Sequence, residues 1–193
     1  MGSNKMVRID KSGDEAGFTM VEIFITLAIA AILLALAVPS FTGLVGDNKI
    51  VSATNEFVAS VHMTRSEAIK RGQRTGMCPS ADPQAAAPVC SATASWTSGW
   101  IIFVDDDEDG VRDAPGEELI LSAEPLSAGF TFTPQPVASP KFKERIYFDT
   151  EGTTITSAGN PVSGQIVIQY GDAETRMINI SATGRIKTEE PVS

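Results

Sequence analysis

The chain has 193 residues, of which 42% are hydrophobic and 20% are charged, and its formal net charge is −9. This composition is typical of a folded protein rather than a disordered one. The acidic balance offers no global attraction for nucleic acid. The sequence holds no phosphate-binding loop, metal-protease motif or nucleophile–base pattern, so we expect no enzyme.

The chain begins with a mixed-charge segment and then an apolar run from Phe18 to Val38, in which Glu22 is the only ionisable residue. At ~1.5 Å per residue, a helix over this run crosses a hydrocarbon core of ~30 Å. A carboxylate in lipid is costly, so Glu22 should have a function. The basic residues near this run lie mostly before it, which predicts a single pass with a cytoplasmic N-terminus.

The residues around the start of the run, Gly17-Phe18-Thr19-Met20-Val21-Glu22, resemble the type IV prepilin signature of type IV pilins and type II secretion pseudopilins. The resemblance implies that residues 1–17 are a leader and that a prepilin peptidase cuts between Gly17 and Phe18. It implies that the new amino group of Phe18 is methylated. It also implies that Glu22 pairs with the N-terminal amine of a neighbouring subunit, which relieves both charges in lipid.

Two other interpretations of this segment stay open. Glu22 at the level of the lipid headgroups would cost little and would need no partner. Ala35-Leu36-Ala37 fits the small-x-small pattern of a signal peptidase site, so the chain would then be an ordinary secreted domain cleaved at Ala37. Against this second interpretation, the leader mixes Asp10, Asp14 and Glu15 with its basic residues, which is unusual before a signal-peptide core.

After the apolar run, the pattern predicts an amphipathic continuation of the helix over 39–72, with Gly72 as its stop. The apolar residues expected on its packed face are Phe41, Leu44, Val45, Val51, Phe57, Val58, Val61, Ala68 and Ile69. We expect Arg65, Lys70, Arg71 and Arg74, near the helix end, to complement the helix dipole and to form solvated or inter-subunit pairs.

Residues 73–193 should form a periplasmic β-rich globular domain, because the apolar period shifts towards two. The predicted strands are 99–104, 118–123, 130–133, 145–148, 165–170 and 176–180, with a loop at 134–140 and a loose tail at 189–193. No helix separates them, so we expect an α+β fold in which an antiparallel sheet packs on the helix. Trp96 and Trp100 are expected in strands or in the core.

Four segments, taken in order, are similar to the GspH/FimT family of type IV minor pilins and type II secretion minor pseudopilins. They are Arg65-Ser66-Glu67-Ala68-Ile69-Lys70-Arg71-Gly72, Cys78-Pro79, Gly99-Trp100-Ile101-Ile102-Phe103-Val104-Asp105 and Ile180-Ser181-Ala182-Thr183-Gly184-Arg185-Ile186. The resemblance implies a type IV pilin-like fold in the inner membrane. It further implies other pilin or pseudopilin subunits as partners and a role in priming or capping a filament. It does not separate a type IV pilus from a type II secretion system.

Cys78 and Cys90 are the only cysteines, and in an oxidising compartment a disulfide is their natural pairing. It would stabilise the fold by about 3 kcal/mol on the chain-entropy model. Free thiols or a metal pair are the weaker alternatives, because no second ligand pair exists and His62 is the sole histidine.

An acidic segment follows the strand predicted at 99–104. Asp105, Asp107, Asp109 and Asp113 alternate like the carboxylates of a calcium loop, and Gly110 permits its turn. The pattern fails at its end, where Glu117 comes one place late. We therefore weigh a calcium site against a solvated acidic hairpin and expect no other cofactor.

The C-terminal Gly184-Arg185-Ile186-Lys187 corresponds to a basic Gly-Arg-x-Arg segment that is implicated in DNA uptake in some relatives. Lys187 departs from that pattern and loses bidentate geometry, while Glu189 and Glu190 weaken any local attraction for DNA. We therefore weigh two interpretations of Arg185 and Lys187: a DNA site, or a final strand with exposed basic residues. We favour the strand.

Overall fold

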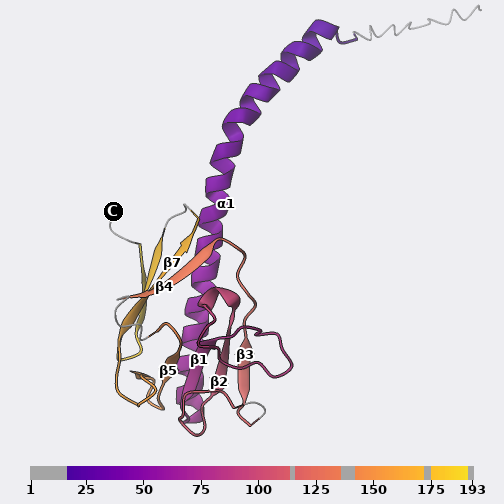
Figure 1. Ribbon diagram of the computed structural model, residues 1–193. Coiled ribbons are helices and arrows are strands. Elements are labelled where there is room, and N and C mark those ends of the chain that lie inside the picture. Colours follow the sequence, from indigo (N-terminus) through magenta and orange to yellow (C-terminus); the bar gives the residue numbers. More distant parts are fainter. Residues whose placement is uncertain (1–16, 114–115, 136–141, 172–174, 191–193) are drawn as a thin grey trace, which may run out of the picture. The chain divides into compact units, whose positions relative to one another are not determined.

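The computed structural model describes residues 17–113, 116–135, 142–171 and 175–190; for residues 36–44 it describes the backbone alone (Figure 1). The chain forms two compact units, Met1–Thr42 and Gly43–Ser193. The leader at 1–16, most of the loop predicted at 134–140 and the end of the tail at 191–193 lie outside the described residues.

Helix α1 spans Met20–Arg71 and so contributes to both units. It ends where the sequence predicts, because Gly72 adopts a left-handed φ of 64° and its N–H donates to the Ala68 carbonyl at 3.0 Å. Among the residues that the structure describes, none of the helical segments combines the length and the apolar character that a membrane crossing requires. The membrane span over Phe18–Val38 therefore stays a prediction.

The second unit contains two antiparallel sheets beside α1, where the sequence analysis expected one (Figure 1). The first sheet has the order β3-β2-β1-β5-β6 and the second has the order β4-β7-β8-β9. Their strands are β1 (Thr75–Pro79), β2 (Trp100–Val104), β3 (Leu119–Ser122), β4 (Phe130–Gln135), β5 (Ile146–Phe148), β6 (Thr154–Ile155), β7 (Gly164–Tyr170), β8 (Arg176–Ile180) and β9 (Ile186–Glu189); a short 3-10 helix, η1, covers Trp96–Ser98.

Strand β1 was not predicted, although it is the centre of the first sheet. All five of its residues are buried, so they show no alternation of apolar and polar positions. Gly76 and Pro79 are residue types that usually mark turns, so they also counted against predicting a strand here. The two-residue strand β6 was also missed. Strand β4 is longer than predicted and includes Pro134 and Gln135.

Phe57 of α1 lies at the centre of the core that joins the helix to the sheets. Its ring makes edge-on contacts with Trp96, Trp100 and Phe132 at centroid distances of 5.2–5.4 Å. The Trp96 indole N–H donates to the Phe142 carbonyl, and the Trp100 indole N–H donates to Ser60 Oγ. The prediction that both tryptophans are core residues is confirmed.

The packed face of α1 differs in part from the predicted one. Phe57, Val61 and Ala68 are buried as expected, and Val58 is partly buried. Val45, Val51 and Ile69 are exposed, so their assignment to this face was wrong. Each of the three is adjacent in sequence to a residue that is buried, and one step along a helix turns a side chain by about 100°. Phe41 and Leu44 lie among the residues whose side chains are not described.

The basic residues near the helix end differ in their surroundings. Lys70 pairs with Glu67 at 3.2 Å on the surface, as expected for a solvated pair, whereas Arg74 is buried, so its assignment to this group was wrong. Arg71 binds Glu67 at 2.6 Å and bridges to Glu118 at 2.6 Å. Arg65 Nε donates to the Gly152 carbonyl at 2.9 Å. Folding places these acceptors next to the helix, so the arginines join α1 to loops far along the sequence.

Candidate functional site

The signature residues at the N-terminus build the start of α1. Thr19 Oγ1 accepts a hydrogen bond from the Glu22 N–H at 3.2 Å, and the Thr19 carbonyl accepts one from the Ile23 N–H. A threonine followed three residues later by glutamate is a capping-box pattern, so this pair also stabilises the first helical turn.

All described side chains from 17 to 35 are exposed, including that of Glu22. The large apolar residues among them are Phe18, Met20, Val21, Ile23, Phe24, Ile25, Leu27, Ile29, Ile32, Leu33 and Leu34. An apolar surface of this extent is typical of a segment that lipid or other protein covers. Cleavage at Gly17, methylation of Phe18 and pairing by Glu22 stay predictions.

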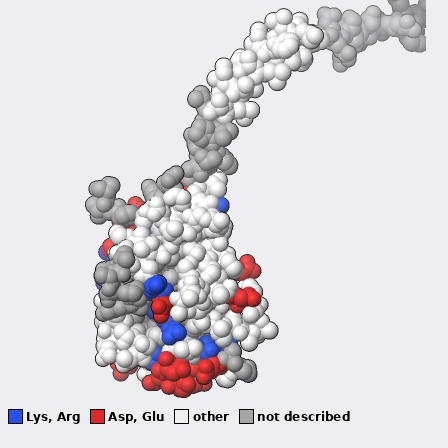
Figure 2. Space-filling view, viewed as in Figure 1, with Lys and Arg blue, Asp and Glu red and all other residues white. Residues whose placement is uncertain are grey.

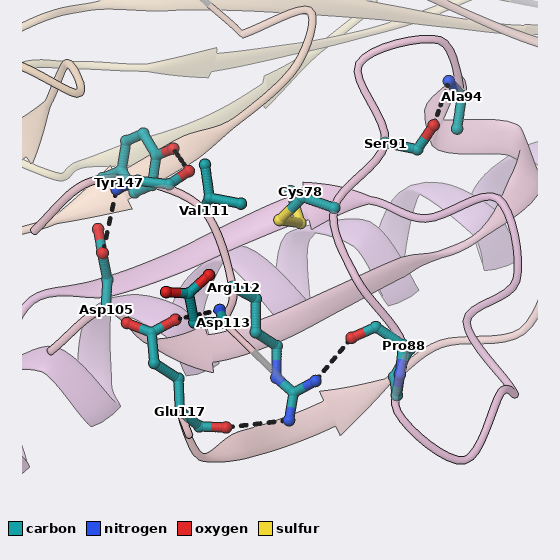
Figure 3. The surroundings of a disulfide bond; sticks show 12 residues. Cys78, Pro88, Ser91, Ala94, Asp105, Val111, Arg112, Asp113, Glu117 and Tyr147 are labelled. Carbon is teal, nitrogen blue, oxygen red and sulfur yellow. Dashed lines mark hydrogen bonds between the residues drawn. A yellow bond between two sulfur atoms is a disulfide. The ribbon is translucent and has the colours of Figure 1, made fainter. Parts of the chain in front are cut away.

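The predicted disulfide is present, with Cys78 and Cys90 joined and their Cα atoms 5.6 Å apart (Figure 3). Both alternatives, free thiols and a metal pair, are therefore wrong. Cys78 is a buried residue of β1, whereas Cys90 is partly exposed. The loop that the bond closes is held at its ends, since Ser80 N–H donates to Gly99 and Ser91 N–H donates to Pro79.

Arg112 connects this disulfide loop to the acidic segment after β2. Its guanidinium is buried and donates to the carbonyl of Pro88 at 2.6 Å and to the carbonyl of Glu117 at 2.9 Å (Figure 3). The carboxylate of Glu117 in turn accepts hydrogen bonds from the N–H groups of Asp106 and Asp113. Burial raises the pKa of Glu117, and these two N–H groups oppose the rise. Glu117 thus holds the acidic segment in place.

Asp105, the first carboxylate of the acidic segment, is buried against Arg74. Arg74 Nε lies 2.8 Å from Asp105 Oδ2, and the Gly110 N–H donates to Asp105 Oδ1 at 3.1 Å. Burial raises the pKa of Asp105, while the Gly110 N–H and the charge of Arg74 oppose the rise. A carboxylate that the sequence analysis placed in a solvated turn or a calcium loop is therefore part of the core.

Arg74 was predicted to be a helix-end charge in a solvated or inter-subunit pair, but the structure places it in this buried site. Its side chain is 5% exposed, and its guanidinium lies 4.5 Å from the centre of the Tyr147 ring. Its Nη1 donates to the carbonyls of Glu108 and Ser157. The signal that was available is its position, because it lies two residues beyond the helix stop and immediately before the apolar strand β1.

The carboxylate oxygens of Asp105, Asp107 and Asp109 lie within 4.8 Å of one another, whereas Asp113 is not part of this group. Asp105 is engaged by Arg74. Asp107 accepts a hydrogen bond from the Asp109 N–H, and Asp109 accepts one from the Val111 N–H. The geometry therefore favours an acidic loop held by protein contacts, and the calcium site stays a prediction.

The acidic loop lies at the end of the second unit where α1 stops, since the Asp105 N–H donates to the carbonyl of Arg74. Acidic side chains gather at this end of the unit (Figure 2). The side chains of Asp106, Asp107, Glu108 and Asp109 are exposed there.

The C-terminal basic pair lies at β9, which confirms the predicted final strand. Both basic residues are exposed; Lys187 forms an ion pair with Glu189, while Arg185 has no ion pair among the described residues. Position 184 requires glycine for a structural reason, because a Cβ there would lie 2.1 Å from the Gly152 carbonyl oxygen. DNA binding by Arg185 and Lys187 stays a prediction.

Comparison with known proteins identifies relatives of this chain. The family model for the type II transport protein GspH matches residues 53–184. No curated protein gives a significant sequence match.

Two crystal forms of the type IV minor pilin FimU from Pseudomonas aeruginosa PAO1 are similar in structure. The first is 21% identical with a TM-score of 0.53, and the match covers 76% of this chain and 95% of that one. The second is 20% identical with a TM-score of 0.50, covering 74% and 97%. The minor pseudopilin EpsH of the Vibrio cholerae type 2 secretion system is 12% identical with a TM-score of 0.48, covering 75% and 99%. The likeness to FimU shows a shared fold.

Proposed function

The chain belongs to the GspH family of type II transport proteins, and from this premise we propose that it is a structural minor pilin of a type IV pilus. A prepilin peptidase removes residues 1–17, the Phe18 amine is methylated, and the apolar segment holds the subunit in the inner membrane. The globular unit then lies in the periplasm. The subunit primes or caps a filament together with other pilin subunits.

The observation that supports this proposal is the exposed apolar start of α1 with its single carboxylate. The globular unit has its own core and does not need this apolar segment for folding. The apolar side chains of the segment must therefore be covered by lipid or by other helices. Within that cover, Glu22 is the one described charged side chain between residues 17 and 35. Its attraction for a neighbour's N-terminal amine would set the axial position of one subunit against the next.

The assembly step is tested by Glu22→Ala. We expect this variant to be cleaved normally but to enter filaments poorly, because the carboxylate serves only the contact between subunits. Glu56→Ala is the matched control, since Glu56 is an exposed carboxylate of the same helix in the second unit. Normal incorporation of Glu22→Ala into filaments would show that charge pairing does not drive assembly.

The maturation step is tested by Gly17→Ala. This chain should accumulate largely with its leader attached, because the prepilin signature that the sequence resembles has glycine before the cleaved bond. Normal removal of residues 1–17 would count against a prepilin peptidase, and a mature N-terminus after Ala37 would instead identify an ordinary secreted domain.

A minor pseudopilin of a type II secretion system is the second candidate, favoured by the description of the matching family. A clean deletion strain separates the two functions when surface pili and secreted proteins are counted in the same cultures. Lost pili with intact secretion would support the minor pilin. Lost secretion with normal pili would replace it with the pseudopilin.

A further inference from the structure

One row of polar side chains crosses the whole second sheet on its outer face. Strand register places Gln135 opposite Gln165, Gln165 opposite Asn179, and Asn179 opposite Lys187. Alternate residues of a strand face opposite sides of a sheet. The neighbouring isoleucines, such as Ile166 and Ile178, are buried, so the row points away from the core.

This row lines the floor of a groove of about 730 Å³, whose other lining residues include Ser163, Ser181 and Arg185. Part of the hydrogen-bonding capacity of the row is used internally, because Gln165 donates to Asn179 and Asn179 donates to Glu189. The Gln135 amide makes no side-chain hydrogen bond among the described residues, and Arg185 makes no ion pair there. Among the described residues, the Gln135 amide and the Arg185 guanidinium are therefore the groups of this groove that have no side-chain partner.

The local charge of this groove is opposite to that of the molecule. The chain carries −9 in total, whereas the groove carries Arg185 and Lys187 against Glu189, the partner of Lys187. Arg185 is exposed and uncompensated among the described residues. A guanidinium in this position binds carboxylates through two parallel hydrogen bonds, with geometric selectivity.

We propose that this groove binds an exposed acidic peptide segment of a neighbouring filament subunit. Arg185 binds a carboxylate of that segment, and the amides of Gln135 and Gln165 bind its main chain. The proposal rests on the proposed function, since it names the kind of partner surface that a filament subunit would meet. The chain's own loop at Asp106–Asp109 is an example of such a segment.

The size of the row fits a short peptide. Four neighbouring strands span three spacings of about 4.8 Å, so the row is roughly 14 Å long. An extended chain rises about 3.3 Å per residue, which makes the row as long as about four residues. The partner segment should therefore be short, with one or two carboxylates placed to reach Arg185.

A nucleic acid fits this groove less well. Duplex DNA carries one charge per about 1.7 Å of axis, and proteins that bind it neutralise several phosphates. The groove has one uncompensated basic side chain among the described residues, and its other polar groups are mainly amides and hydroxyls. A short acidic peptide needs only one ion pair and several hydrogen bonds.

The experiment measures binding of a labelled peptide to the full chain in detergent by fluorescence anisotropy. The probe has the sequence Asp-Asp-Glu-Asp of residues 106–109, and its Asn-Asn-Gln-Asn counterpart is the control probe. We expect saturable binding of the acidic probe that weakens as salt is raised. Arg185→Gln should weaken it about tenfold, which corresponds to about 1.4 kcal/mol. Lys70→Gln, which removes an exposed charge at the end of α1, should not change it.

Several outcomes would overturn the proposal. They are no binding of the acidic probe, equal binding by Arg185→Gln, or equal binding of the uncharged probe. Binding of a DNA duplex that depends on Arg185, without binding of the peptide, would identify the groove as a DNA site. Glu22→Ala should bind the probe like the unchanged chain, so a failure of filament assembly and a failure of the groove give different results.

Discussion

Replacing Arg74 with methionine tests how far the buried ion pair with Asp105 supports the fold. Methionine keeps much of the length and the apolar stem of the side chain but removes its charge. Asp105 then stays buried without an opposite charge, and the carbonyls of Glu108 and Ser157 lose a donor. Breaking such a pair from one side costs about 3–5 kcal/mol, because the remaining charge is uncompensated.

This loss should be visible in thermal unfolding. For a domain of the size of the second unit, 1 kcal/mol shifts Tm by about 2–4 °C. Arg74→Met should therefore lower Tm by about 6–20 °C at neutral pH. Circular dichroism in the far ultraviolet, followed against temperature on the full chain in detergent, measures the shift.

The size of the loss should depend on pH. Burial raises the pKa of Asp105, and removal of Arg74 raises it further. Between the ordinary and the raised pKa, the folded state binds a proton that the unfolded state does not, so the free energy of unfolding falls as pH rises. The deficit of Arg74→Met should be smallest near pH 4, close to the ordinary pKa of aspartate, and largest at neutral pH.

The double variant Arg74→Met with Asp105→Asn is the matched control. It should recover part of the lost stability at neutral pH and show less of the pH dependence, because no buried charge is left without a partner. A loss below about 1 kcal/mol in the single variant would refute the reasoning, since that is the range of exposed pairs. A deficit equal at both pH values, and not reduced in the double variant, would also refute it.

Three further outcomes are expected. Cys78→Ser should lower the free energy of unfolding by about 3 kcal/mol in urea titrations; an unchanged midpoint would show that the disulfide loop holds without the bond. Gly184→Ala should cost at least about 1–2 kcal/mol, because its φ of 74° is left-handed and its Cβ would meet the Gly152 carbonyl; normal stability would contradict that contact. Tm should not change with calcium or chelator, because Arg74 already binds Asp105; a calcium-dependent rise that Asp107→Asn abolishes would establish the calcium site.

The features that could be predicted from the sequence depend on residues close together in the chain. The end of α1 at Gly72 is a local signal, because a glycine follows the last residue of the helical pattern. The pairing of Cys78 with Cys90 was predictable because the chain has no other cysteine. The strands that show alternation, such as β7 and β8, were found within one residue of their bounds.

Tertiary structure decided the contacts between residues far apart. From the sequence, Arg74 was expected to be a solvated charge near the helix end. In the fold it pairs with Asp105 and donates a hydrogen bond to the carbonyl of Ser157. Both residues are charged, and no local pattern indicates that two distant charges will be buried together.

Strand register decided the polar row in the same way. Gln135 and Lys187 belong to one groove only because three strand pairings have the observed alignment. A slip by one residue would turn these side chains to the opposite face of the sheet. The sequence by itself therefore determined the helix, the disulfide and the N-terminal signature, which are local. The site on the sheet and the burial of Asp105 depended on packing, because pairing energies between distant segments leave no periodic signal in the chain.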